Sequence, residues 1–314
     1  MVLQGRMTPM SRWMRESIAV ITALALGTIP LEGGGQALAP DTLFAHSATR
    51  PDAAGRLDAR MIVDRHFNRR RRVWVYTPPG YDANRPAPYP LIIAFDGESY
   101  RDSMPLPRVL DSLAARGRTE PFVAVLVDDS AGAVRVAVLG NSARIAAFMA
   151  QQLVPWVRRG WHVTRDPARV ILTGSSEGGL GAAWVAIAHP ELFGNVWAQS
   201  GAFWRGAEGS NEPPYEWLAQ RVGLQPRVKV RFALDVGELE DHATLGGRGP
   251  DFREAARRFR DALKAKGHEV IYTEVPGGQH GQRWWRDRLA AGIVALSAYW
   301  PPPTPEVPRR RRAS

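Results

Sequence analysis

Cysteine is absent from the 314-residue chain, and its absence removes several chemistries. The protein has no disulfide framework, no thiolate nucleophile and no cysteine-based zinc or iron–sulfur site. Because a secreted protein need not contain disulfides, the lack of cysteine is compatible with both an oxidising and a reducing compartment. The sequence also lacks a G-x-x-x-x-G-K-[S/T] phosphate-binding loop and an H-E-x-x-H zinc helix. We therefore expect a mechanism that needs no cofactor and no metal.

Lysine is scarce, since it supplies only three of the 41 basic residues. The formal net charge of +10 would suit a nucleic-acid partner. Four of the arginines, however, form the block 309–312 after a proline-rich segment, so residues 301–314 are expected to be a disordered tail. No aromatic residues alternate with the basic runs, as a single-strand binding groove would require. We expect a solvated basic surface and no nucleic-acid partner.

Apolar runs long enough to span a bilayer are also missing. The apolar stretch 18–29 is too short, but it follows three arginines, and Ala37-Leu38-Ala39 supplies the small residues that a signal peptidase needs. Residues 1–39 are therefore predicted to be a signal peptide, which implies a periplasmic or secreted product with no membrane span. The same stretch would also fit a core helix or a mis-assigned start codon. Residues 40–64 are polar and irregular, and we expect a flexible lead-in there.

Short apolar segments alternate with segments of helical periodicity along the rest of the chain. Strands are expected at residues 72–76, 91–95, 122–127, 170–173, 196–199, 230–236 and 270–275. Helices are expected at residues 109–115, 143–157, 178–189 and 252–266. Most of the strands lack a polar face, which favours a mostly parallel sheet with helices on both faces. Residues 65–300 are thus predicted to form one α/β domain.

The strongest local pattern is Gly174-Ser175-Ser176-Glu177-Gly178, a G-x-S-x-G sequence between an expected strand and an expected helix. It is typical of the nucleophile elbow of α/β-hydrolases, where a strained turn projects the serine hydroxyl clear of the sheet. In isolation, the pentapeptide would also fit an ordinary glycine-rich turn. We predict an α/β-hydrolase fold with Ser176 as the nucleophile, and Ser175 is the neighbouring alternative.

A serine hydroxyl is a weak nucleophile unless a base takes its proton. His280 is the best candidate, because it lies in a glycine-flanked loop directly after the last expected strand. The chain order nucleophile, acid, histidine also favours it. The other histidines lie before the nucleophile, in its helix or in other turns, and they are His46, His66, His162, His189, His242 and His268.

An acid should hold the histidine, and four carboxylates lie at the end of the strand 230–236. They are Asp235, Glu238, Glu240 and Asp241. We predict Glu240, with Asp241 as the alternative, because an acid just past the strand end can reach the far nitrogen of the imidazole. Asp235 would lie within the sheet.

Two backbone amides should bind the oxyanion of the reaction. One is the amide of Glu177, which directly follows the nucleophile. The other is expected in the turn Phe95-Asp96-Gly97-Glu98 after an earlier strand, where Gly97 lets the backbone approach the reacting carbonyl closely. Taken alone, Asp96-Gly97 would also fit an ordinary turn.

Several further stretches match a known family in order and in sequence. They are residues 73–81, 95–98, 103–105, 174–180, 189–194, 199–204 and 278–286. With them the chain resembles the esterase family that includes enterochelin and other siderophore esterases, with feruloyl esterases and mycolyltransferases as more distant relatives. The matching stretches cover nearly all of the expected domain.

The resemblance implies the α/β-hydrolase fold, no cofactor, and a catalytic set of Ser176, Glu240 and His280. It also implies polar substrate contacts from the segment 135–141, so Arg135 and Asn141 are candidate specificity residues. Trp204 and Trp285 lie in the matching stretches and are further candidates for substrate binding. The chain departs from the family in two places: Val138 stands near a position where glutamate is usual, and the Gly-Gly-His of the family has one more residue, Gln279.

The reaction predicted from these residues is hydrolysis of a small-molecule carboxylic ester through an acyl-enzyme. Two alternatives remain at this point. One is an acyltransferase on the same fold, which would pass the acyl group to a sugar or an alcohol. The other is a non-catalytic binding protein for an anionic siderophore or glycan, which the richness in arginine suggests. The sequence indicates neither the natural acyl group and alcohol nor the oligomeric state.

Overall fold

The computed structural model describes residues 54–129, 132–140, 142–207, 210–213, 215–241 and 250–300. The predicted signal peptide 1–39, the predicted tail 301–314 and the candidate Asn141 lie outside these described residues. Within them, no helix is both long and apolar enough to cross a membrane.

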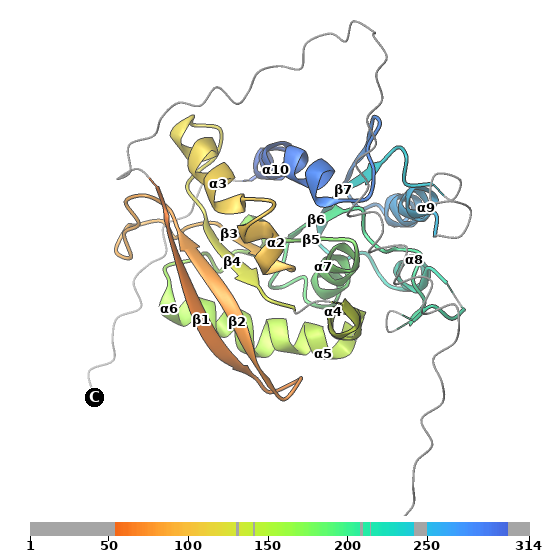
Figure 1. The fold of residues 1–314 in the computed structure, drawn as a ribbon, viewed down its shortest axis with the longest axis horizontal. Coiled ribbons are helices and arrows are strands. Elements are labelled where there is room, and N and C mark those ends of the chain that lie inside the picture. Colours follow the sequence, from red (N-terminus) through yellow and green to blue (C-terminus); the bar gives the residue numbers. More distant parts are fainter. Residues whose placement is uncertain are drawn as a thin grey trace, which may run out of the picture.

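One eight-stranded sheet forms the centre of the molecule (Figure 1), and its strand order is β1-β2-β4-β3-β5-β6-β7-β8. The strands are β1 Arg56–Asp64, β2 Arg69–Thr77, β3 Leu91–Ala94, β4 Val123–Val127, β5 Val170–Ser175, β6 Asn195–Gln199, β7 Arg231–Gly237 and β8 Val270–Val275. The strands from β4 to β8 in this order are parallel, whereas β2 pairs antiparallel with both of its neighbours, β1 and β4. The predicted α/β-hydrolase fold, with a mostly parallel sheet, is confirmed.

Helices cover both faces of this sheet. They are α2 Gly97–Arg101, α3 Leu106–Ala115, α4 Gly132–Gly140, α5 Ser142–Ala147, α6 Val154–Gly160, α7 Glu177–Ala188, α8 Trp217–Leu224, α9 Phe252–Ala265 and α10 Gln282–Ser297, with the short turns η2 Phe148–Leu153 and η3 Pro167–Arg169. In Figure 1, α3 and α10 lie on one side of the sheet and α5, α6 and α7 on the other.

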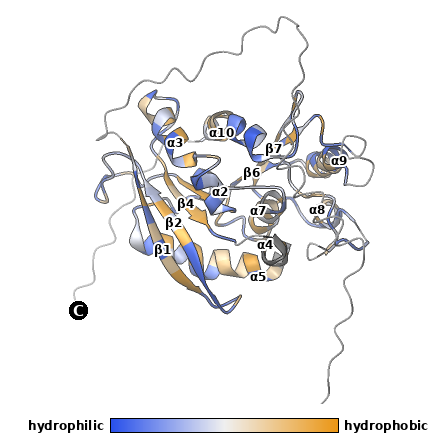
Figure 2. Cartoon of the chain, in the orientation of Figure 1, coloured by the Kyte–Doolittle hydropathy of each residue, from blue (hydrophilic) through white to orange (hydrophobic). Residues whose placement is uncertain are grey.

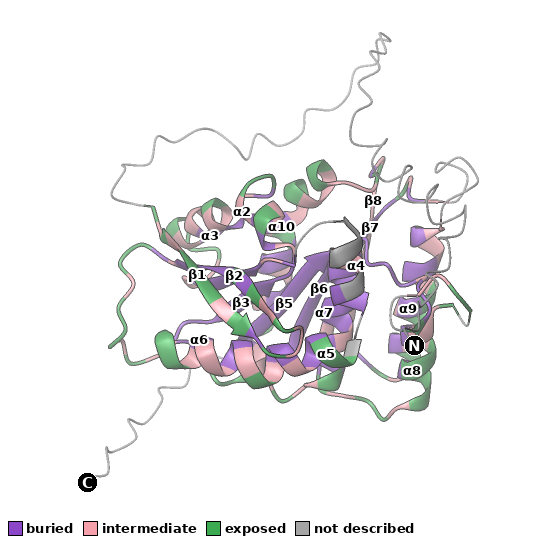
Figure 3. Ribbon diagram, turned by 60° about the horizontal axis from the view of Figure 1, so that its bottom comes forward, coloured by how far each residue is buried: buried purple, intermediate pink, exposed green. Residues whose placement is uncertain are grey.

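Alternate residues of the strands pack into two separate cores, because successive side chains of a strand point to opposite faces. Ile92 packs in the core under α3 and α10, and the next residue, Ile93, packs in the core under α7. The central strands are coloured largely hydrophobic in Figure 2 and buried in Figure 3. This two-sided burial explains why most of the strands have no polar face.

The helix expected at residues 143–157 is divided into α5, the π-helical turn η2 and α6. Pro155 stands at the start of α6, has no amide hydrogen and would clash with the carbonyl four residues earlier in a regular helix. The wider π turn before it accommodates the ring.

The prediction that residues 40–64 form a flexible lead-in is wrong for residues 56–64. These residues form β1, which pairs in antiparallel register with β2 along its whole length, from Arg56 opposite Thr77 to Asp64 opposite Arg69. As an edge strand, β1 is held by its pairing with β2, and its side chains are mostly exposed. Leu57, Ala59, Met61 and Val63 alternate along β1 but stay half-buried or exposed, so the segment has no continuous apolar run like those of the central strands. Residues 40–53 lie outside the described part of the chain.

The parallel register brings several strand ends to one edge of the sheet. Ala94 is opposite Thr173, Ser175 is opposite Gln199, and Gly237 is opposite Val275. Turns that follow β3, β5, β7 and β8 must therefore meet at this edge, which is the usual place for ligands in open α/β sheets.

Candidate active site

Ser176 occupies the sharp turn between β5 and α7. Its backbone has φ 55° and ψ −118°, a strained conformation for a residue with a side chain. Gly174 and Gly178 flank the turn at such close range that a Cβ on Gly174 would lie 2.5 Å from the carbonyl carbon of Gly178. The turn is fixed to the next strand, because the Ser176 amide donates to the Gln199 carbonyl at 2.9 Å. This geometry is that of a nucleophile elbow.

His280 lies in the loop between β8 and α10, and it faces Ser176. Its Nε2 is 3.2 Å from Oγ of Ser176, and its Nδ1 is 2.6 Å from Oε2 of Glu240. The imidazole is held between two aromatic rings, those of Phe252 and Trp285, with centroid distances of 4.3 and 5.0 Å. A proton on Oγ is thus within hydrogen-bond reach of a base that is oriented at its other nitrogen.

Glu240, three residues past the end of β7, is almost completely buried. While Oε2 contacts His280, Oε1 accepts hydrogen bonds from the Gly237 amide at 2.8 Å and the Ser200 hydroxyl at 2.5 Å. These donors fix the position of the carboxylate.

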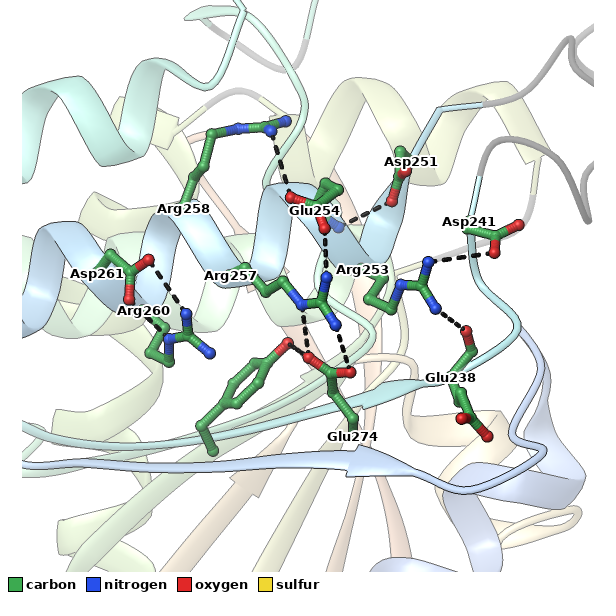
Figure 4. A network of polar contacts seen from close by, with 11 residues as sticks. Glu238, Asp241, Asp251, Arg253, Glu254, Arg257, Arg258, Arg260, Asp261 and Glu274 are labelled. Carbon is green, nitrogen blue, oxygen red and sulfur yellow. Dashed lines mark hydrogen bonds and ion pairs between the residues drawn. The ribbon is translucent and has the colours of Figure 1, made fainter.

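The alternative acids are directed elsewhere. Asp241 contacts the guanidinium of Arg253 at 3.2 Å, and Figure 4 shows this pair at the start of α9. Asp235 lies within β7, as expected, and contacts Arg288 at 3.2 Å. Of these three acids, the structure brings only Glu240 to the imidazole.

Four other histidines have contacts away from this site. His66 is joined through its carbonyl to Arg144, and His162 contacts the carbonyl of Arg85. His189 pairs with Glu191 at 2.9 Å, and His268 contacts the Val230 carbonyl while its burial lowers its pKa. His46 and His242 lie outside the described residues.

The two predicted oxyanion donors begin two helices at the same edge of the sheet. Gly97 is the first residue of α2, and Glu177 is the first residue of α7. The first turn of α7 lies against the residue that precedes α2: a Cβ on Gly178 would be 2.6 Å from Oδ2 of Asp96. A helix N-terminus presents free amides to a developing negative charge.

The Glu177 side chain is neutralised by an arginine. Arg205 donates from Nε to Oε1 of Glu177 at 2.7 Å, and both side chains are largely buried. The guanidinium carbon of Arg205 lies 4.3 Å from the ring centroid of Trp204. The pair keeps a bare carboxylate from opposing the oxyanion next to the nucleophile.

The candidate substrate residues have contacts within the protein. Arg135 donates from Nη2 to Oδ2 of Asp96 at 2.6 Å and to the carbonyl of Ser175 at 2.9 Å. Trp204 packs edge-on against Phe252. The indole N–H of Trp285 donates to the Ser200 hydroxyl at 2.8 Å. Arg135 and Trp285 are therefore engaged in holding the site together.

Two polar residues behind the site are absent from the sequence prediction. Ser200 links Glu240 to Trp285, and Gln199 accepts from the Tyr100 hydroxyl at 2.8 Å and donates to the Trp285 carbonyl at 2.7 Å. Gln199 is the last residue of β6, and Ser200 follows it. Their place at the end of a predicted strand beside the nucleophile is the signal that could have identified them. Burial raises the pKa of Tyr100, so its hydroxyl stays protonated as a donor.

The fold and the linked serine, histidine and glutamate define the class of this protein, which is that of the α/β-hydrolase-fold proteins. The family follows from the sequence. Residues 65–296 match the model of the family described as "Putative esterase", and the chain belongs to this esterase family.

Two curated relatives are iron(III) enterobactin esterases. The protein from Dickeya dadantii is 31% identical over 254 residues, which are 79% of this chain and 56% of the relative. The protein from Escherichia coli K12 is 29% identical over 232 residues, covering 74% of this chain and 54% of the relative. The chain thus spans about half the length of these relatives.

Solved structures agree in fold. The enterobactin esterase from Shigella flexneri, determined in the presence of enterobactin, superposes with a TM-score of 0.66 at 27% identity and covers 77% of this chain and 58% of that one. A ferulic acid esterase from Anaeromyces mucronatus has a TM-score of 0.63 at 15% identity and covers 83% and 95% of the two chains. The second likeness shows the shared fold alone.

Proposed function

We propose that this protein is a serine esterase that hydrolyses carboxylic esters of the siderophore type. The observation that carries the proposal is the continuous hydrogen-bonded chain from Ser176 Oγ through His280 to Glu240, with distances of 3.2 and 2.6 Å. The chain order serine, acid, histidine and the strained serine turn are those of hydrolases with this fold.

In the first half of the reaction, Oγ of Ser176 attacks the ester carbonyl carbon while His280 Nε2 takes the hydroxyl proton. The carbonyl π electrons move to oxygen, and the amides of Gly97 and Glu177 bind this oxyanion. When the tetrahedral intermediate collapses, the ester C–O bond breaks, and His280 returns the proton to the leaving alcohol.

In the second half, water replaces the alcohol. His280 takes a proton from the water as its oxygen attacks the acyl carbon, and the bond from the acyl carbon to Ser176 Oγ then breaks. The proton passes to Oγ, and the free acid leaves. Throughout, Glu240 holds Nδ1 and stabilises the imidazolium that forms.

The substrate class rests on sequence relatives. Enterobactin esterases from two organisms match across most of the described domain, and a third is similar in structure. The segment around Arg135 departs from the family, since Val138 stands near a position where glutamate is usual, and we therefore include other esters beside catecholate ones in the test.

The experiment is an ester screen with the purified full chain. The panel contains a ferric catecholate siderophore, feruloyl and acetyl sugars, and short p-nitrophenyl esters, and the released acid is quantified. We expect hydrolysis of the siderophore ester and of the activated esters. Ser176→Ala should lower turnover by several orders of magnitude, because the binding and oxyanion groups alone retain little catalysis.

Active-site labelling provides the second measurement. A fluorophosphonate should modify Ser176, as mapped by peptide mass spectrometry, and no label should appear in Ser176→Ala. Undiminished turnover in Ser176→Ala, or a label on a different serine, would show that the nucleophile is wrong. Transfer of the acyl group to added sugars in preference to water would point to an acyltransferase.

We also propose that the chain is exported, on the basis of the arginines and the apolar stretch 18–29 before Ala37-Leu38-Ala39. Mass spectrometry of the mature protein from its native host should show an N-terminus at or near residue 40. A mature protein that retains residues 1–39 would contradict this proposal.

A further inference from the structure

Arg135, on α4, joins two turns that are far apart in the sequence. Its Nε and Nη2 each contact one carboxylate oxygen of Asp96, and Nη2 also donates to the carbonyl of Ser175 at 2.9 Å. Asp96 precedes Gly97, and Ser175 precedes Ser176 and Glu177. One guanidinium therefore contacts the residue directly before the donor Gly97 and the residue directly before the nucleophile Ser176.

Both turns need such a restraint. Asp96 has φ 56° and ψ 43° and Ser176 has φ 55°, which are unfavourable for residues with a Cβ. Residues in such conformations persist only where the surroundings over-determine them. A planar guanidinium with two donors on one carboxylate fixes orientation as well as distance.

The amide of Asp96 is held from the opposite direction. It donates to Oδ2 of Asp129 at 3.0 Å, and Oδ1 of Asp129 accepts from Arg71 at 2.7 Å. Arg71 is anchored in turn on Asp64, the last residue of β1, at 2.5 Å. The turn after β3 is thus held at its side chain by Arg135 and at its backbone by a buried chain that reaches the edge strand.

We propose that Arg135 is a positioning residue for the oxyanion hole, acting through Asp96 and the Ser175 carbonyl to set the spacing between the amides of Gly97 and Glu177. This inference rests on the proposed function, because it needs Ser176 as the nucleophile. It differs from the expectation that Arg135 recognises the substrate, since Nε and Nη2 of its guanidinium are engaged by Asp96 and by the Ser175 carbonyl.

The two roles predict different kinetics. A substrate-binding arginine acts on anionic esters and mainly through KM. A positioning residue acts on every ester, including a small neutral one with no group for an arginine to bind, and mainly through kcat. Loss of one oxyanion donor costs about 10²–10³-fold in kcat, and a shift of about 1 Å can cost about 10²-fold.

The experiment compares Arg135→Lys and Arg135→Ala with the wild-type full chain on p-nitrophenyl acetate and on mono-p-nitrophenyl glutarate, which carries a carboxylate. We expect kcat to fall by about 10²-fold in Arg135→Ala on both esters, with KM changed by less than about threefold. Arg135→Lys keeps the charge but cannot reach Asp96 with two donors and Ser175 as well, so its loss should be intermediate. Arg260→Lys, on α9 beside Asp261 (Figure 4), is the matched control and should leave the kinetics unchanged.

A thiono ester gives a readout of the oxyanion hole itself. Sulfur accepts hydrogen bonds more weakly than oxygen, so an intact hole prefers p-nitrophenyl acetate over p-nitrophenyl thionoacetate. The rate ratio of the two esters should fall in both Arg135 variants and stay at the wild-type value in Arg260→Lys. A variant that has lost only stability would keep this ratio.

The proposal would be overturned by a loss confined to KM on the glutarate ester, or by an unchanged oxygen-to-sulfur rate ratio. The proposal would also be overturned if Arg135→Lys did not unfold cooperatively on heating, because the ion pair with Asp96 would then be needed to fold the whole domain. Ser176→Ala tests the proposed function separately: if it retains wild-type turnover, the nucleophile assignment fails, whatever the Arg135 variants do.

Discussion

The hydroxyl of Ser200 donates a hydrogen bond of 2.5 Å to Oε1 of Glu240. The same hydroxyl accepts a hydrogen bond from the indole N–H of Trp285 at 2.8 Å, so its single proton is directed to the carboxylate. Because the other oxygen of Glu240 contacts His280, Ser200 determines how this carboxylate faces the imidazole. Trp285 takes part twice, through its N–H and through its ring beside His280.

Ser200→Ala should therefore reduce turnover without removing any group that touches the substrate. The variant leaves Oε1 with the Gly237 amide and leaves the half-buried Trp285 N–H without its acceptor, a loss of order 1–3 kcal/mol in hydrogen bonding. We expect kcat to fall about tenfold, since 1.4 kcal/mol corresponds to one power of ten. Ser297→Ala, on α10 away from this edge, is the control for a lost hydroxyl. Wild-type kcat in Ser200→Ala would contradict a role in holding Glu240.

The two adjacent acids at the end of β7 should differ sharply on substitution. Glu240→Gln keeps the shape but removes the charge that orients the imidazole, and we expect kcat to fall by about 10³-fold or more. Asp241→Asn alters the contact with Arg253 and leaves the carboxylate that reaches His280 in place, and we expect a change of less than about threefold. Steady-state kinetics on p-nitrophenyl acetate measures both. A larger loss in Asp241→Asn would make Asp241 the acid that orients His280. Equal losses would contradict the choice of Glu240.

The local part of the site could be predicted from the sequence, because its signals are local. A strand rich in β-branched residues, followed by a G-x-S-x-G sequence and a helix of small residues, indicates the serine turn without reference to the rest of the chain. His280 follows a recognisable strand in a glycine-flanked loop. The structure brings these two residues within 3.2 Å of each other although 104 positions separate them.

The supporting residues could not be predicted, because their roles depend on tertiary contacts. Arg135 is expected from the sequence only as a substrate contact and Ser200 is an ordinary serine there, and only the packing of α4 and the end of β6 shows what they touch. Asp64, at the end of a polar segment, is completely buried by its pairing with Arg71. Buried and exposed ion pairs use the same residue types, so a polar segment does not reveal which of its charges lie inside.

Gly97 should tolerate no side chain. A Cβ at this position would lie 2.6 Å from the carbonyl carbon of Leu126 and 2.7 Å from the amide nitrogen of Val127, both backbone atoms of β4. Because a strand in the middle of the sheet cannot move without loss of pairing, Gly97→Ala should lower the free energy of unfolding by about 1–3 kcal/mol. It should also reduce kcat by displacing the oxyanion turn.

The matched control for Gly97→Ala is Gly223→Ala in α8. A Cβ there meets nothing within 4 Å, and alanine favours the helix over glycine by up to about 1 kcal/mol. Denaturant unfolding should thus show opposite signs for the two variants. Equal stability of Gly97→Ala and wild type would show that the turn has more room than the Cβ distances indicate.

Asp129 should make the stability of the fold depend on pH. The pKa of the Asp129 carboxyl is raised to about 7, because burial and the neighbouring carboxylate of Asp96 outweigh Arg71, the Asp96 amide and Arg135, which act in the opposite direction. In the unfolded chain the carboxyl returns to its ordinary pKa of 3.8. Between about pH 4 and pH 7 the folded state therefore binds more protons than the unfolded state. The stabilisation that results is complete below this window and is lost as pH rises through it.

Asp129→Asn replaces the titrating group with an amide of the same shape, so this contribution to the pH dependence should vanish. We expect the free energy of unfolding of wild type, relative to that of Asp129→Asn, to decrease from pH 4.5 to pH 7.5 in urea titrations at constant ionic strength. Asp287→Asn, at an exposed pair with Arg286, keeps Asp129 and should follow the wild-type trend. The free energy of unfolding of wild type relative to Asp129→Asn could instead be constant with pH or increase as pH rises. The buried carboxyl would then be ionised through the whole window, because Arg71 and the Asp96 amide outweigh the cost of its burial.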